Sequence, residues 1–244
     1  MLISFLLISF VGDIVVRDEK RKLTFFSHVA SFIAKLTLML LSIKVAAKGI
    51  DRLNRGDKNY LIVSNHVSYL DIFVISSVSK SVFVANSELG EEFPLGTVTR
   101  YGGGIFVERR NRTKLLEDIE YISKVLGMGI NVVLFPEGTT SNGERVRSFK
   151  TPFLSPALKY KTDILPICLK YKTVNGEEIN NENRDLVFYH GSISFFGHFF
   201  RMLNTGSITV EVSELEKIPV DNSSNRKELS ELAHDRINSA YLSD

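Results

Sequence analysis

Two long apolar stretches open the chain, and shorter apolar runs follow them. Residues 1–16 are apolar apart from Asp13, and a basic stretch, residues 17–22, comes next. A second stretch, residues 23–47, contains His28 and two lysines, and its apolar residues recur at helical spacing. Such spacing gives a helix one apolar face. The pattern therefore predicts a pair of N-terminal helices.

These two helices have two interpretations, because they can pack on the folded domain or associate with a membrane. The first stretch is shorter than the roughly 20 apolar residues of a spanning helix. It also lacks the preceding positive charge and the cleavage site of a secretory signal. We favour a membrane-associated helical pair in residues 1–48, in which the first stretch is a candidate anchor and the basic residues 17–22 lie on the cytoplasmic side.

From residue 49 onward the pattern changes to short apolar runs that alternate with helical segments. Runs rich in Val, Ile, Phe and Leu and bounded by Gly, Pro or Asn are typical of strands. Their alternation with helices predicts an α/β domain in residues 49–244, in which helices flank a mixed central sheet. The predicted strands are residues 60–64, 82–85, 105–107, 131–135, 164–171 and 207–212, and the predicted helices are residues 69–77, 113–126, 152–160 and 224–242.

Composition narrows the classes of partner and site. The 244 residues carry a net charge of +2, so bulk charge does not indicate nucleic acid, and any anion binding must come from local clusters. The single cysteine, Cys168, excludes an intramolecular disulfide and a thiolate metal cluster, and its aliphatic neighbours indicate a core residue. His28, His190 and His198 lack metal-ligand spacing, so we predict no metal site.

The segment NHVSYLD, residues 65–71, directly follows the first predicted strand. Ser68 and Asp71 have the spacing of a capping box, which by itself explains both residues as a helix start. A helix that begins at Ser68 also lets the Asp71 carboxylate reach back to His66 and fix its tautomer. The other imidazole nitrogen is then free to accept a proton. This segment alone fits a helix start and a general base equally well.

An arginine stands at the end of the predicted strand 105–107. Arg109 follows this strand directly, and its planar guanidinium can hold an anion through two hydrogen bonds. We expect Arg109 to contact a ligand. The other basic residues nearby, Arg110, Arg112 and Lys114, are better explained as a solvated helix start.

A hydroxyl-rich loop follows the predicted strand 131–135. Pro136 ends the hydrogen bonding of the strand, and Gly138 permits backbone conformations closed to other residues. Glu137 is thereby held at an edge of the sheet, and Thr139 offers donors for a phosphate or another polar head group. An ordinary turn is the alternative interpretation.

In this order, the segments resemble the motifs of the PlsC-like glycerolipid acyltransferase family (1-acylglycerol-3-phosphate acyltransferases and other lysophospholipid acyltransferases). NHVSYLD resembles the NHxSxxD block, and residues 104–109 resemble the block that ends in arginine. FPEGTTS, residues 135–141, resembles FPEGTRS, and the Leu-Pro-Ile of residues 165–167 resembles the fourth block. Its proline, Pro166, indicates an edge strand or a strand start. The resemblance covers about residues 45–215.

The resemblance implies transfer of a fatty acyl group from acyl-CoA or acyl carrier protein to the free hydroxyl of a lysophospholipid, without a cofactor. His66 would be the general base and Asp71 would orient it. The implied partners are the acyl donor, a lipid acceptor and the membrane surface, with no nucleic acid. The residues implied to bind the acceptor are Arg109, Glu137, Gly138 and Thr139.

Two departures from the family pattern bear on the acceptor. Asn86 stands where the family often has lysine, and Thr140 stands where arginine is common. Both remove positive charge, which raises the case for a lyso-aminolipid such as lyso-ornithine lipid beside the predicted 1-acylglycerol-3-phosphate. A catalytically silent membrane-binding module is disfavoured by the intact pair of His66 and Asp71. A serine hydrolase is disfavoured because the chain has no G-x-S-x-G elbow.

Overall fold

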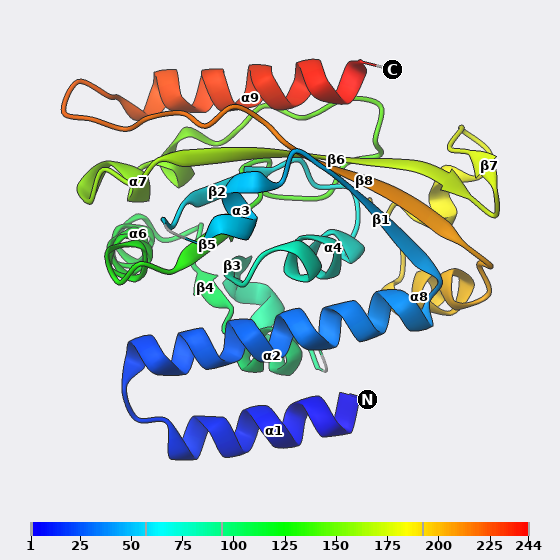
Figure 1. The fold of residues 1–244 in the computed structure, drawn as a ribbon, viewed down its shortest axis with the longest axis horizontal. Helices are drawn as coiled ribbons and strands as arrows, with labels where there is room; N and C mark the ends of the chain where they lie inside the picture. Colours follow the sequence, from blue (N-terminus) through cyan, green and yellow to red (C-terminus); the bar gives the residue numbers. More distant parts are fainter. Residues whose placement is uncertain (1, 57, 94, 192, 244) are drawn as a thin grey trace.

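A mixed eight-stranded sheet forms the centre of the molecule (Figure 1). The computed structural model describes residues 2–56, 58–93, 95–191 and 193–243. The strands are β1 (Ile43–Lys48), β2 (Leu61–Ser64), β3 (Ser81–Asn86), β4 (Ile105–Val107), β5 (Asn131–Leu134), β6 (Ile164–Val174), β7 (Glu177–Glu178) and β8 (Ile208–Glu214). Their order is β1-β8-β6-β2-β5-β3-β4, with β7 paired to β6. Only the pairs of β6 with β8 and β7 are antiparallel, so the predicted α/β class with a mixed sheet is confirmed.

Helices cover both faces of this sheet. In Figure 1, α9 lies above the sheet, whereas α4 and then α2 lie below it. The α-helices are α1 (Leu2–Val15), α2 (Glu19–Leu40), α3 (Asp51–Arg55), α4 (Leu70–Val78), α5 (Leu95–Tyr101), α6 (Arg112–Gly127), α7 (Pro156–Lys159), α8 (Phe195–Leu203) and α9 (Arg226–Leu242). Short 3-10 helices are η1 (Ser87–Glu91), η2 (Thr151–Leu154) and η3 (Arg184–Leu186).

The apolar runs of the central strands follow from burial on both faces. Successive side chains of a strand point to opposite faces of the sheet. In β2, Leu61 and Val63 belong to the hydrophobic core on one face, and Ile62 belongs to the core on the other. All three are fully buried. A parallel strand covered on both sides therefore needs a continuous apolar run, which is what made β2 and β5 recognisable.

The second N-terminal apolar stretch divides into a helix and a strand. The helix α2 ends at Leu40, the chain reverses at Ser42 with a φ of 54°, and Ile43–Lys48 form β1. This strand pairs in parallel with β8, with Ile43 opposite Ile208. The prediction of helical structure up to residue 47 is therefore wrong at its end. Residues 43–48, assigned to the N-terminal helices, belong to the sheet.

Two proline positions also differ from the predictions. The predicted helix 152–160 is broken into η2 and α7, and Pro156, which lacks a backbone donor, begins α7. Pro166 is the third residue of β6, an interior strand between β2 and β8. The strand-start alternative for Pro166 thus holds, and the edge-strand alternative is wrong. The helices α5 and α8 were not predicted.

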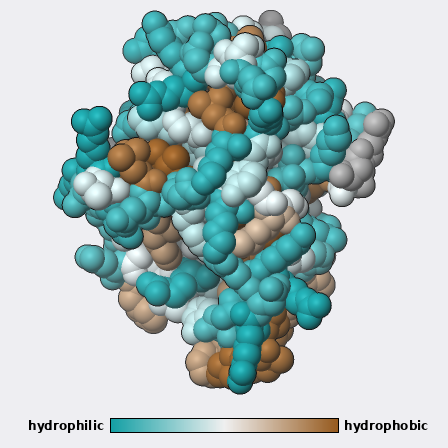
Figure 2. Space-filling view, turned by 90° about the vertical axis from the view of Figure 1, so that its left-hand side faces the viewer, coloured by the Kyte–Doolittle hydropathy of each residue, from teal (hydrophilic) through white to brown (hydrophobic). Residues whose placement is uncertain are grey.

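The helices α1 and α2 form an N-terminal hairpin, as predicted. Among the described residues, α2 is the one helix long and apolar enough to cross a membrane, although part of it is buried against the domain. Large apolar side chains of α1 face outward, and Figure 2 shows apolar residues at the lower end of the molecule, where α1 lies. The hairpin gives the protein an apolar surface suited to membrane association. The exposed members on α1 are Ile3, Leu7, Ile8, Phe10, Val11, Ile14 and Val15.

Candidate active site

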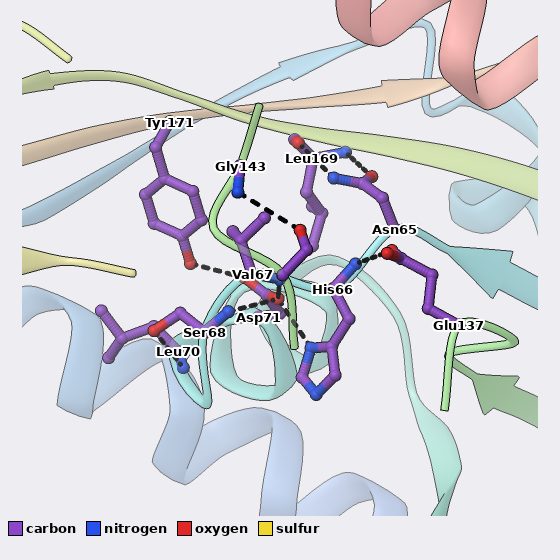
Figure 3. Close-up of polar contacts among 11 residues, drawn as sticks. Asn65, His66, Val67, Ser68, Leu70, Asp71, Glu137, Gly143, Leu169 and Tyr171 are labelled. Atoms are coloured by element: carbon purple, nitrogen blue, oxygen red, sulfur yellow. Dashed lines mark hydrogen bonds and ion pairs between the residues drawn. The ribbon is translucent and has the colours of Figure 1, made fainter. Parts of the chain in front are cut away.

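The loop between β2 and α4 brings a histidine and an aspartate together (Figure 3). Nδ1 of His66 lies 2.8 Å from Oδ2 of Asp71. The two residues are five positions apart along the chain, and the helix begins between them, so the carboxylate turns back toward the loop. The predicted contact between His66 and Asp71 is confirmed.

The helix itself begins later than predicted. Its first residue is Leu70, and Tyr69 at the N-cap position makes no side-chain capping bond. The Ser68 hydroxyl instead accepts a hydrogen bond from the Leu70 N–H at 3.3 Å. Asp71 accepts from the Ser68 N–H at 3.0 Å, which is the reciprocal half of a capping box. The predicted N-cap at Ser68 is therefore wrong by one residue, although both polar side chains do serve the helix start.

The Asp71 carboxylate is fully buried and held by several donors. Its Oδ2 atom also accepts from the Val67 N–H at 2.8 Å. Its Oδ1 atom accepts from the Tyr171 hydroxyl at 2.7 Å. Since a carboxylate can only accept, Nδ1 of His66 carries the proton of the pair. The remaining lone pair of the imidazole is then on Nε2.

The imidazole of His66 is fixed by stacking as well as by hydrogen bonding. Its ring lies parallel to that of Phe135, with 3.9 Å between centroids and 12° between planes. The side chain is 17% exposed. Figure 3 shows Nε2 on the side of the ring that points away from Asp71. This nitrogen is therefore placed to take a proton from a group outside the protein core.

Glu137 connects the loop after β5 to the loop after β2. Its Oε1 atom accepts from the His66 N–H at 2.7 Å, and its Oε2 atom accepts from the Arg147 N–H at 2.9 Å. The Ser141 N–H donates to the His66 carbonyl at 2.8 Å, which ties the same loops a second time. Burial raises the pKa of Glu137 to about 7. In this structure Glu137 holds the backbone of His66 in place, since its two carboxylate oxygens accept hydrogen bonds from the N–H groups of His66 and Arg147.

Arg109 reaches the same loop from the end of β4. Its Nη1 atom donates to the Gly138 carbonyl at 2.5 Å, and its guanidinium lies 5.1 Å from the centre of the Phe153 ring. Burial lowers the pKa of Arg109 from its ordinary value. Its Nε atom is buried and has no hydrogen-bond partner among the residues the structure describes. The Arg109 guanidinium, with one unpaired N–H donor, therefore lies beside the turn formed by Pro136, Glu137 and Gly138.

The turn at Gly138 has a positive φ of 79°, which favours glycine. A Cβ atom at Gly138 would lie 2.7 Å from Nζ of Lys150, so this lysine also lies against the turn. Thr139, the next residue, is exposed at the surface of the loop. The structure therefore gathers the predicted residues at one end of the parallel strands, where α/β proteins place their ligands.

Two residues of the site had no recognised role in the sequence. Tyr171, on β6, lies 100 positions from the carboxylate to which it donates, and no local signal marks it. Asn65 exchanges two hydrogen bonds of 2.8 Å with the backbone of Leu169 and is fully buried. The position of Asn65 next to His66 was the one available hint.

Cys168 is a core residue, as predicted. It is 3% exposed, and burial raises the pKa of its thiol to about 12. A thiol with so high a pKa carries little thiolate at neutral pH, so it is a poor nucleophile. The chemistry of the site therefore centres on the imidazole of His66.

The fold and the histidine–aspartate site define the class of the protein: the chain belongs to the acyltransferase family, whose family model, described as Acyltransferase, matches residues 44–170. It is 32% identical to a lyso-ornithine lipid O-acyltransferase of Rhizobium meliloti, over 83% of this chain and 71% of that protein. It is 30% identical to a 1-acyl-sn-glycerol-3-phosphate acyltransferase of Borreliella burgdorferi, over 75% of this chain and 69% of that protein.

A solved structure shares the fold. The 1-acyl-sn-glycerophosphate acyltransferase of Thermotoga maritima superposes with a TM-score of 0.68 at 21% identity, over 97% of this chain and 85% of that chain. The family resemblance noted in the sequence and the predicted enzyme class, an O-acyltransferase, are confirmed.

Proposed function

We propose that the protein transfers a fatty acyl group from acyl-CoA or acyl carrier protein to the free hydroxyl of a lyso-lipid held in the membrane. The observation that carries this proposal is the buried pair of His66 and Asp71, with Nδ1 and Oδ2 2.8 Å apart and Nε2 facing away. Membership of the acyltransferase family supports the same reaction.

In the proposed mechanism, Nε2 of His66 removes the proton from the acceptor hydroxyl. The resulting oxygen attacks the thioester carbonyl carbon, the carbon–sulfur bond breaks, and the leaving thiolate takes up the proton from the imidazolium. Asp71 stabilises the imidazolium while it exists. Neither an acyl-enzyme nor a cofactor is required, which agrees with the buried, high-pKa thiol of Cys168.

Arg109 and the turn that follows Glu137 form the acceptor side of the site. The guanidinium of Arg109 and the ammonium of Lys150, which both lie against Gly138, offer positive charge for an anionic head group. Gly138 lets the backbone approach the lipid closely, and the exposed Thr139 offers a hydroxyl. Glu137 contributes by holding the backbone of His66.

For the acceptor we favour a lyso-aminolipid such as lyso-ornithine lipid. Asn86 and Thr140 remove two positive charges that a phosphate monoester would use, and Asn86 instead donates to Glu88 at 2.9 Å. The similarity to the Rhizobium meliloti enzyme supports this choice. 1-Acylglycerol-3-phosphate is the second candidate, because Arg109 and Lys150 both lie against the same turn.

The proposed location is the cytoplasmic face of a membrane. The basic residues Lys20, Arg21 and Lys22 lie at the start of α2, next to the apolar hairpin. Positive residues beside apolar helices favour the cytoplasmic leaflet, whose lipids are anionic.

The function is tested by assaying wild-type protein with labelled acyl-CoA and acyl carrier protein against a panel of lyso-lipids. We expect His66→Ala to lower kcat by about 10²-fold or more while the protein stays folded. His190→Ala is a matched control, since Nε2 of His190 lies 3.2 Å from Asp185, also five positions away, and we expect it to keep full activity. Full activity of His66→Ala would overturn the mechanism, and failure of every acceptor would favour the silent membrane-binding module.

A further inference from the structure

The helix α8 presents its apolar side chains outward. Its buried residues are His198 and Met202. Phe196, Phe200 and Leu203 are instead 55%, 61% and 44% exposed. These three lie at spacings of four and three, so they form one stripe along the helix. A surface helix of a soluble domain normally buries its apolar residues and turns polar groups to water, whereas α8 also exposes this apolar stripe to the surroundings.

The inward face of α8 is attached to the active-site loop. Nδ1 of His198 lies 3.0 Å from the hydroxyl of Tyr69, which is within the NHVSYLD segment. The Tyr69 ring also packs edge-on against Phe195, with 5.3 Å between centroids, and against Tyr189 at 5.6 Å. This aromatic packing fixes the orientation of α8 against the core, so the outward stripe is a stable feature of the fold.

The stripe continues toward the N-terminal hairpin. At the C-terminal end of α2, Met39 and Leu40 are each 67% exposed. The residues that follow α8, Gly206 and Ser207, line the same hollow as Leu38 and Met39. The C-terminal end of α2 and the segment that follows α8 are therefore neighbours.

Basic side chains surround this apolar region. Lys35 and Lys44 line the hollow between α2 and the segment that follows α8, and both are exposed. Arg201 is exposed on α8 itself. An apolar stripe with aromatic residues and a basic border matches the chemistry of an anionic bilayer surface, in which phenyl groups enter the boundary between head groups and acyl chains.

We propose that α8 is an interfacial helix that inserts Phe196, Phe200 and Leu203 into the lipid bilayer and seats the active site on it. The inference extends the proposed function, since it assigns the membrane contact that presents the acceptor. The contact of α8 with Tyr69 puts the inserted helix next to His66. The membrane surface would thereby lie beside the loop that carries His66.

The natural absence of tryptophan provides a direct test. Full-length Phe200→Trp carries a single indole on the stripe, and Leu232→Trp carries one on the exposed face of α9 as a matched control. With vesicles of phosphatidylcholine and phosphatidylglycerol, we expect the emission of Phe200→Trp to shift to shorter wavelength and that of the control to stay unchanged. No shift in Phe200→Trp overturns the proposal. A shift that grows with protein concentration without vesicles also overturns it, because the stripe then binds a second copy of the chain.

A second measurement compares two double variants in vesicle flotation. We expect Phe196→Ser/Phe200→Ser to lower the partition coefficient by about ten-fold or more, because two exposed phenyl groups no longer leave water. Leu116→Ser/Leu232→Ser removes exposed leucines from α6 and α9 and should bind as the wild type does. Equal binding by both double variants contradicts the proposal.

The binding and the reaction can fail separately. Flotation and fluorescence need no turnover, so they test α8 even if no acceptor is acylated. With an active enzyme, Phe196→Ser/Phe200→Ser should lose activity toward acceptor in vesicles and keep kcat toward a dispersed short-chain acceptor. Equal loss toward both acceptors would indicate damage to the active site and would overturn the membrane role.

Discussion

Asp71 is the residue on which the polar contacts of the site converge. It accepts from a side chain in its own loop, from two backbone N–H groups and from Tyr171 on β6. With both carboxylate oxygens bonded, Asp71 has one orientation, and so does the imidazole of His66. This convergence explains how a short loop can hold the proposed general base in one orientation.

Removing the Tyr171 hydroxyl should loosen this arrangement. Tyr171→Phe leaves Oδ1 of a fully buried carboxylate without its 2.7 Å donor. We expect the free energy of unfolding to fall by about 1–3 kcal/mol and kcat to fall about ten-fold, with KM for the acceptor nearly unchanged. Urea unfolding and steady-state kinetics check the two effects. An unchanged kcat would show that Tyr171 has no positioning role.

Glu137 should make stability depend on pH. Burial raises its pKa to about 7 from the ordinary 4.5, so the folded state keeps a proton that the unfolded state releases in between. The free energy of unfolding therefore falls as pH rises through this window, by up to ~3 kcal/mol. Glu137→Gln removes the titrating group, and urea midpoints at pH 5 and pH 8 should differ less in this variant than in the wild type. Equal differences in both proteins would contradict this assignment.

At the scale of elements, the pairing of β2 with β6 determines where the catalytic loop begins. The strand β2 ends at Ser64, opposite Ile167, and its backbone then leaves the sheet. The Asn65 side chain continues the pairing by bonding the N–H and the carbonyl of Leu169. The loop that carries His66 therefore leaves the sheet while its first residue, Asn65, is still bonded to β6.

Asn65→Ala should release the first residue of this loop from β6. The substitution removes two buried hydrogen bonds and leaves the N–H and carbonyl of Leu169 without that partner. We expect a loss of about 2–4 kcal/mol in the free energy of unfolding, and faster hydrogen exchange at the Leu169 amide. Asn65→Asp keeps the acceptor but puts a carboxylate oxygen against the Leu169 carbonyl in a buried site, so it should not restore the lost stability. An exchange rate unchanged in Asn65→Ala would show that β6 needs no such support.

At the scale of the whole molecule, the apolar surfaces of α1 and α8 have a common purpose in our proposal. They belong to helices that are far apart in the sequence, and α2 follows α1 in the N-terminal hairpin (Figure 1). One bilayer that contacts both would hold the protein at separate points and fix its orientation. The active-site loop, attached to α8 through Tyr69, would then face the lipid.

Two separate contacts with one bilayer should contribute additively to the free energy of membrane binding. Leu7→Ser/Val11→Ser/Ile14→Ser removes an exposed stripe of α1, and we expect it to lower vesicle partitioning about as much as the α8 double variant does. The five substitutions together should multiply the two fold-changes, because the sites are distant. Flotation measures all three. If the α8 substitutions have no effect once α1 is altered, the two surfaces do not contact the bilayer independently.

The sequence by itself determined the α/β class, most strands and the residues of the candidate site. Strands buried on both faces need continuous apolar runs, and polar residues that follow such runs lie at one edge of the sheet. The spacing of His66 and Asp71 around a helix start allowed their contact, and the neighbouring motifs with their family resemblance favoured it.

Only the tertiary structure decided the rest, because the contacts involved join distant parts of the chain. The strand β1 was hidden at the end of an apolar stretch, since its identity depends on pairing with β8. The donor Tyr171 is 100 positions from Asp71. The hydrogen bond from the His66 N–H to Glu137 forms only because the loops after β2 and β5 meet. The outward stripe of α8 is also a tertiary property: sequence periodicity shows that a helix has an apolar face, and packing alone decides whether that face meets the core or the surroundings.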